Sequence, residues 1–241
     1  MVVPDIALTA AIVAVAGLLH GYTGGFGSGL LMIPLLSIQI GPVQAIATSC
    51  IMGMAATIPL VRAARRSVSW RQLWPLVGAA IVTTPIAASF LFVADPTFIR
   101  RLIGAFVILS VALLATGWTY RGARTRLLDG LAGAVGGALS GIAGMSGPVV
   151  AIYFLSAPEP PETIRARIVF TVVALIIITF STLMLAGVVE KATLIQAALV
   201  LPLNLGGVFL GAWLFRRAPA AWFRPAALVL LAVVGLSALV S

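Results

Sequence analysis

Two glycine-rich breaks interrupt long apolar segments, one in each half of the chain. The first is Gly21–Gly29 and the second is Ser140–Pro148. Inside a bilayer, non-helical backbone is tolerated only where protein buries it or water lines it. A matched pair of interrupted apolar segments is also the sequence pattern that best indicates the binding site of a membrane transporter. The breaks therefore constrain the chain to a membrane fold whose interior holds two broken helices.

Composition agrees with an all-α polytopic membrane protein. Of the 241 residues, 61% are hydrophobic and only 9% are charged, which is typical of chains surrounded by a lipid bilayer. No stretch is polar enough for a separate soluble domain, so residues 1–241 are expected to form one integral membrane domain. No basic residue precedes the first apolar run, which favours an uncleaved membrane segment over a signal peptide.

The apolar runs between the breakers predict ten helical segments, most of them near the roughly 20 residues that a spanning helix needs. The expected segments are 5–20, 29–39, 43–62, 73–93, 98–118, 127–140, 148–157, 166–188, 193–214 and 221–240. At about 1.5 Å per residue, the segment 148–157 rises only about 15 Å and cannot cross a bilayer. We therefore expect each break to form the tip of a re-entrant helix hairpin.

The basic residues predict an orientation. Twelve of the 15 fall in four loops that share one side of this topology: Arg62, Arg65, Arg66, Arg71, Arg121, Arg124, Arg126, Arg165, Arg167, Arg216, Arg217 and Arg224. The positive-inside rule makes that side cytoplasmic and both termini extracytoplasmic. The formal net charge of +9 is then explained by topology, without a nucleic-acid partner. If each broken segment instead crossed the membrane twice in full, the same loops would still lie on the cytoplasmic side. The distribution of basic residues therefore leaves that alternative open.

The two halves resemble each other. Ser28-Gly29 aligns with Ser146-Gly147, and Leu91-Phe92…Pro96…Arg101 aligns with Leu214-Phe215…Pro219…Arg224. Each half contains one hairpin and three crossings, and an odd number of crossings inserts the second half upside down. We therefore expect two inverted repeats, 1–121 and 122–241, whose hairpin tips enter from opposite faces and meet near the midplane.

The expected tips have the chemistry of an anion site. Ser28 and Ser146 suit helix N-caps, and Pro148 suits a first helical turn. A helix N-terminus offers free N–H groups and about half a positive charge, and glycine lets a ligand approach the backbone closely. The candidate binding residues at the tips are Gly25, Gly27, Ser28, Gly29, Gly144, Ser146 and Gly147. The alternative is that these small residues only allow helices to pack closely together.

Other polar residues within the spans have two interpretations each. Thr48 and Ser49 could complete the site or bond back to their own helix carbonyls. Asn204 could serve the substrate or a neighbouring helix. Three accessory candidates also have two interpretations each. His20 is a proton carrier or an interfacial hydrogen-bonding group, and Cys50 is a sulfur-reactive thiol or an inert small side chain. Arg167 is a source of positive potential or a topological signal.

The six acidic residues all fall at or near segment ends. No span centre carries a carboxylate, and no histidine cluster, paired carboxylates or phosphate-binding loop is present. We therefore expect neither an enzyme nor an ATP-driven pump, and no metal or cofactor. An anion leaving a cell with a negative interior gains about 2.3 kcal/mol per charge per 100 mV, so export needs no coupling ion.

Gly24–Leu36 (GGFGSGLLMIPLL), followed by Ala47-Thr48-Ser49, resembles the signature of the sulfite exporter TauE/SafE family of bacterial membrane proteins. Gly144–Val150 is similar to that family's second glycine-rich motif, with Met145 and Ser146 in place of glycines. The resemblance covers essentially the whole chain. It implies outward transport of sulfite, sulfonates or related small anions across the bacterial cytoplasmic membrane.

Together these patterns predict an alternating-access exporter of a small oxyanion, bound between opposed half-helix ends. An importer or channel for another small anion or organic acid is the first alternative. The second is a membrane subunit that transports nothing and scaffolds an enzyme. The sequence leaves open whether the protein is a monomer or a homodimer.

Overall fold

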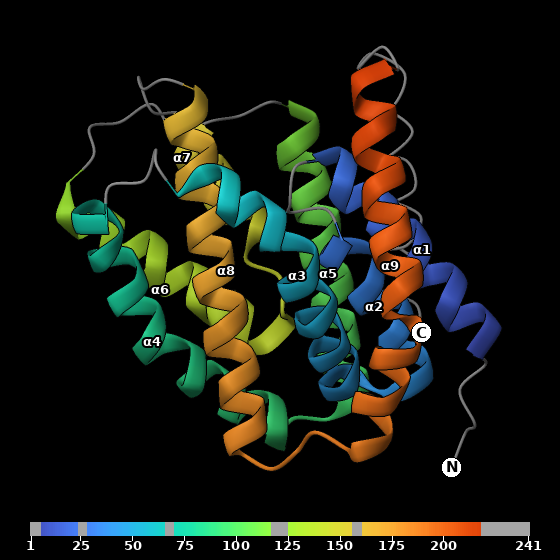
Figure 1. The fold of residues 1–241 in the computed structure, drawn as a ribbon. Helices are drawn as coiled ribbons and strands as arrows, with labels where there is room; N and C mark the ends of the chain where they lie inside the picture. The colour runs from blue at the N-terminus through green and yellow to red at the C-terminus, as the bar shows by residue number, and fades with distance from the viewer. Residues whose placement is uncertain (1–5, 24–27, 66–69, 117–124, 156–160, 218–241) are drawn as a thin grey trace.

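The computed structural model describes residues 6–23, 28–65, 70–116, 125–155 and 161–217, and within them the chain is all-helical (Figure 1). The helices of this part of the chain are α1 (Ile6–Thr23), α2 (Ser28–Ile40), α3 (Pro42–Ala64), α4 (Trp70–Val93), α5 (Pro96–Thr116), α6 (Arg126–Ala143), α7 (Gly147–Leu155), α8 (Pro161–Leu185) and α9 (Lys191–Arg217). Nine of the ten expected segments are therefore helices. The tenth, 221–240, lies outside the described residues.

Six helix boundaries differ from the expectation by three to five residues, about one turn. Helix α8 begins at Pro161 rather than at residue 166, because proline at the first helical position is pre-organised and has no N–H to leave unpaired. Helix α1 continues to Thr23, so the first break is shorter than its glycine run indicated.

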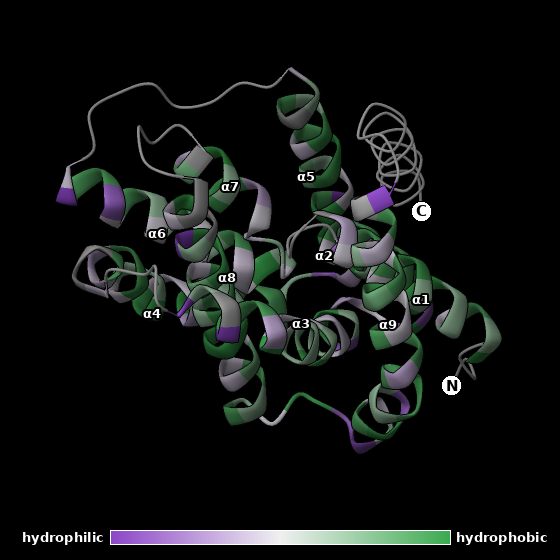
Figure 2. Ribbon diagram, turned by 45° about the horizontal axis from the view of Figure 1, so that its top comes forward, coloured by the Kyte–Doolittle hydropathy of each residue, from purple (hydrophilic) through white to green (hydrophobic). Residues whose placement is uncertain are grey.

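Five of these helices, α3, α4, α5, α8 and α9, are long and apolar enough to cross a membrane. Figure 2 shows hydrophobic residues along the lengths of the helices and hydrophilic ones at places such as the start of α6 and the end of α9. Large apolar side chains also face outward, including Ile86, Leu199 and Phe209. In a bilayer, lipid tails solvate these side chains, which confirms the coarse prediction of a polytopic membrane protein.

The most extensive helix contacts join the two halves of the chain: α4 packs against α6, and α1 packs against α9. Glycines make both contacts close. A Cβ atom on Gly21 would overlap the Val208 carbonyl of α9, and one on Gly133 would overlap the Leu76 carbonyl of α4. Small residues let backbones approach in this way where no hydrophobic force drives association. Helices α3 and α8 pack against each other as well.

Gly206 and Gly207 of α9 provide a matched pair for testing this packing. A Cβ on Gly207 would overlap the Ala14 carbonyl of α1 and lie 3.0 Å from Leu18 N, whereas one on Gly206 would meet nothing within 4 Å. We expect Gly207→Ala to lower stability by roughly 1–3 kcal/mol. Gly206→Ala should be neutral or stabilising by up to about 1 kcal/mol. Thermal unfolding in detergent measures both, and equal Tm values would contradict the packing account.

Candidate functional site

The second break is a helix C-cap followed directly by a new helix. Gly144 ends α6 in the left-handed conformation, with φ 66°, which glycine adopts without strain. Its N–H donates to Ser140 O at 2.9 Å, and Met145 N–H reaches Leu139 O at 3.5 Å. The first is the single 5→1 bond of an αL cap. The Ser140 carbonyl near the end of α6 therefore has a partner within the protein.

Helix α7 begins immediately after this cap. Val150 N–H donates to Ser146 O at 3.1 Å, so the Ser146 backbone occupies the predicted N-cap position. Pro148 is the second residue of the helix, where a missing N–H costs nothing. The N-terminus of α7 thus starts within three residues of the C-terminus of α6.

At the first break, α2 begins with Ser28 itself. The Ser28 hydroxyl forms a buried hydrogen bond of 2.9 Å with His20 Nδ1 of α1, so this side chain joins the two arms of the break. The predicted tip residues Gly25 and Gly27 lie outside the described residues.

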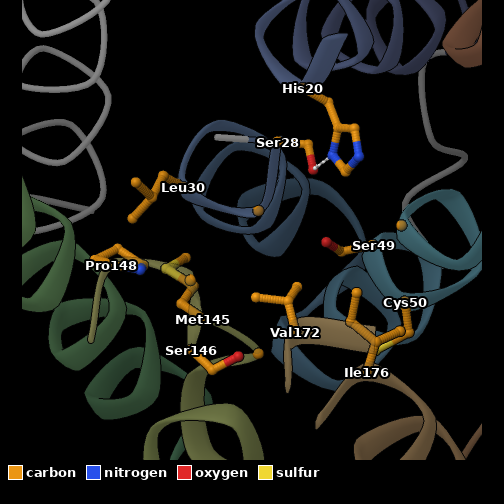
Figure 3. Close-up of a pocket in the computed structure, with 14 residues that line it drawn as sticks. His20, Ser28, Leu30, Ser49, Cys50, Met145, Ser146, Pro148, Val172 and Ile176 are labelled. Atoms are coloured by element: carbon orange, nitrogen blue, oxygen red, sulfur yellow. Dashed lines mark hydrogen bonds between the residues drawn. The ribbon is translucent and has the colours of Figure 1, made fainter. Parts of the chain in front are cut away.

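A cavity of ≈ 40 Å³ lies where the two helix N-termini come together (Figure 3). Helices α3 and α8 form its other walls. The residues that line it are His20, Ser28, Gly29, Leu30, Ser49, Cys50, Gly53, Gly144, Met145, Ser146, Gly147, Pro148, Val172 and Ile176. The two breaks are in direct proximity, because a Cβ on Gly29 would lie 3.8 Å from Gly144 O. The cavity thus brings together residues that are more than a hundred positions apart in sequence.

The cavity lies at mid-length of two spans. Cys50 and Gly53 flank the centre of the span Pro42–Arg62, and Val172 and Ile176 flank the centre of the span Ala166–Leu185. If both helices cross a bilayer from end to end, the cavity is near its midplane. The serine hydroxyls at that depth face a cavity between helices, whereas polar groups that faced lipid there would be costly.

Most of the residues predicted for the site line this cavity. The predicted residues that do so are Ser28, Gly29, Ser49, Gly144, Ser146, Gly147, His20 and Cys50. The sequence analysis did not single out Gly53, which lies one helical turn after Ser49. That spacing of four residues was the available signal, because it places both on one face of α3.

Thr48, Asn204 and Arg167 do not line the cavity. The Thr48 hydroxyl donates to the Gln44 carbonyl of its own helix at 2.9 Å. Asn204 Nδ2 donates to Val13 O of α1 at 3.1 Å and so joins α9 to α1. For these two residues the structure matches the alternative interpretation, in which the polar group serves a helix. Arg167 is buried in α8 outside the cavity lining.

The electrostatics of the cavity come from backbone ends and hydroxyls. Ser28, Ser49 and Ser146 contribute hydroxyls, and among the described residues no carboxylate, lysine or arginine lines the cavity. The helix dipoles of α2 and α7 add partial positive charge at their N-termini. Across the described part of the chain, no group of three His, Cys, Asp or Glu side chains could hold a metal ion. The arrangement is suited to binding a small anion.

The fold and this cavity define a multi-pass membrane protein with an interior cavity. The chain belongs to the sulfite exporter TauE/SafE family, whose profile matches residues 9–238. It is therefore a transporter rather than an enzyme. A protein named "Probable sulfite/organosulfonate exporter TauE" from Cupriavidus necator is 27% identical over 200 residues, which cover 78% of this chain and 75% of that protein. No solved structure matches the chain.

Gly144 should be the most demanding position at the second break. A side chain there would be strained by the positive φ, and its Cβ would lie 2.8 Å from Ile33 Cδ1 of α2. We expect Gly144→Ala to lower the free energy of unfolding by roughly 1–3 kcal/mol. Gly130→Ala, at an open position in the same helix, is the matched control. Denaturant unfolding in detergent compares the two, and a Gly144→Ala protein as stable as the control would refute this assignment.

Proposed function

We propose that the protein exports a small sulfur-containing anion, sulfite or an organosulfonate, through the cavity between the N-termini of α2 and α7. The observation that carries the proposal is the meeting of two helix N-termini in one buried cavity of ≈ 40 Å³. At roughly 10–15 Å³ per water, the cavity has room for about three waters. That space suits an anion of a few heavy atoms, such as sulfite. The printed name of the Cupriavidus necator relative supports the same substrate class.

The architecture we propose for this transport is a pair of inverted repeats, 1–121 and 122–241. In this correspondence α1 to α4 are equivalent to α6 to α9. The helix contacts support this correspondence. When each helix is replaced by its equivalent, the α4–α6 contact becomes the α9–α1 contact and the α4–α8 contact becomes the α9–α3 contact. The contact between α3 and α8 stays the same. Each re-entrant hairpin would consist of a break and its two arms. Helices α2 and α7, of 13 and nine residues, rise only about 20 Å and 14 Å.

Alternating access follows from this arrangement. Helices α3 and α8 contact each other and both line the cavity, so a rocking of one repeat against the other would move two walls of the site together. Ser28, Gly29, Ser49, Ser146 and Gly147 would hold the anion in both states. Transporters with inverted repeats commonly open to each side in this way around a site that stays fixed.

The proposed orientation places the arginine-rich ends of the helices in the cytoplasm and both termini outside. Helices α5 and α9 end, and α8 begins, at the top of Figure 1. Trp213 lies near the same end of α9, with the Arg217 guanidinium 4.5 Å from its ring centroid. Tryptophan and arginine in this combination favour a membrane interface. With this orientation, the membrane potential would drive an anion outward.

Substitutions of different size at position 29 test whether the anion binds in this cavity. A Cβ there would make ordinary contacts, 3.6 Å from Ile33 Cδ1 and 3.7 Å from Ser49 Oγ, so Gly29→Ala should bind sulfite within about threefold of the native affinity. The two further methyl groups of Gly29→Val would occupy the cavity. We expect its affinity to fall at least tenfold, or about 1.4 kcal/mol.

Calorimetric titration of sulfite into purified protein measures both affinities, with thermal unfolding as the check on folding. If a folded Gly29→Val protein bound sulfite as tightly as Gly29→Ala, the anion would have to bind elsewhere. Titration of acetate or another organic acid in place of sulfite addresses the importer and channel alternatives. A protein that bound none of these anions would point to a scaffold role, and its mass in detergent would show whether it is a homodimer.

A further inference from the structure

The hydrogen bonding of the His20 side chain is incomplete. It is only 1% exposed, and its Nδ1 atom is paired with Ser28 Oγ at 2.9 Å. Its Nε2 atom is buried and has no hydrogen-bond partner among the residues that the structure describes. Figure 3 shows the imidazole ring reaching from α1 toward Ser28 at the edge of the cavity. A buried polar atom without a partner is costly, and at a binding cavity it indicates a ligand contact.

The pairing with Ser28 determines what Nε2 can offer. Ser28 also lines the cavity, and its hydroxyl has a single hydrogen to donate. If that hydrogen points at an anion, the hydroxyl must accept from Nδ1–H, which leaves a lone pair on Nε2. A lone pair repels an anion. Protonation converts Nε2 into a donor and gives the anion a positive partner.

We propose that the anion binds together with one proton, and that His20 Nε2 is the atom that receives it. This inference rests on the proposed function and deepens it. An imidazolium alone would be an uncompensated charge in the buried cavity, whereas an imidazolium and an anion together form a hydrogen-bonded pair. Ser28 is the positioning residue, because it fixes the ring and the tautomer through Nδ1.

Among the described residues of the helices packed against α1, Cys50 is the one other titratable side chain that lines the cavity. Helix α1 packs against α2, α3 and α9. Helix α2 contains no titratable side chain, and in α9 these side chains lie at the two ends. In α3 they are Cys50, which lines the cavity, and Arg62, in the last turn. On α1 itself, Tyr22 follows His20 by two residues, and residues 24–27 are Gly-Gly-Phe-Gly. Cys50 is thus the competitor that an experiment must exclude.

The proton changes what is transported. Divalent sulfite would bind and move with one proton and therefore with a net charge of minus one, so the membrane potential would still favour export. Sulfite accepts a proton near neutral pH, whereas sulfate does not. Sharing a proton between Nε2 and the anion would therefore favour sulfite over sulfate.

The test uses the fact that His20 is the only histidine in the chain. Protein labelled with ¹⁵N-histidine, with any affinity tag removed, gives one imidazole signal in NMR spectra. Methanesulfonate is the probe, because it carries no titratable proton of its own near neutrality. At a pH where the free protein shows a neutral imidazole with Nδ1–H, saturation with methanesulfonate should produce the two protonated nitrogens of an imidazolium.

The linked measurement is affinity against pH. Methanesulfonate affinity of the native protein should rise up to tenfold for each unit that pH falls, as expected for one bound proton. His20→Gln, which keeps a polar side chain but cannot be charged, should bind with an affinity that does not vary with pH. Cys50→Ser should retain the native slope, because it removes only the other titratable cavity side chain.

A saturating anion that leaves His20 neutral would overturn the proposal while leaving the proposed function intact. The same conclusion would follow from a His20→Gln protein with the native pH slope. If neither methanesulfonate nor sulfite bound to the native protein, the proposed function itself would fail, and this inference with it.

Discussion

The structure depends on which hydrogen-bond partners the backbone N–H and C=O groups find at two interrupted helices. At the second break, the Gly144 N–H caps the Ser140 carbonyl of α6, and α7 starts two residues after Met145. The N–H groups of its first turn have no helical partner, as at any helix start. The first break brings α2 to the same place. The partial positive charges of two helix N-termini therefore meet in one cavity, which is why we propose an anion as its ligand.

Close glycine packing provides the rest of the architecture. Helix α1 lies against α9, and α6 lies against α4, at distances that a Cβ would prevent. Each pair joins one half of the chain to the other, so neither half is an independent unit. Because the contacts are made by backbone and small residues, they fix the positions of α1 and α6, which carry the two breaks. Membrane helices without a hydrophobic driving force commonly associate in this way.

The sequence predicted the breaks, the helices and most of the cavity, because glycine, proline and helix caps act locally. It could not predict helical phase inside a span. Thr48 and Ser49 were equivalent candidates, yet a step of one residue turns about 100° around the helix, and only Ser49 lines the cavity. It also could not decide which neighbour an isolated polar group would meet. The structure places the Asn204 amide at the Val13 carbonyl and the His20 ring at Ser28, and both depend on tertiary packing.

The most direct test of the central claim is sulfite flux in proteoliposomes that contain only the purified protein, under an imposed membrane potential. Saturable efflux of sulfite from the negative compartment, resistant to excess sulfate and acetate, is the result that the account predicts. Flux of acetate or sulfate without flux of sulfite would keep the fold and refute the substrate. A correctly inserted protein that moves no anion at any potential would contradict the claim that this cavity is a transport site.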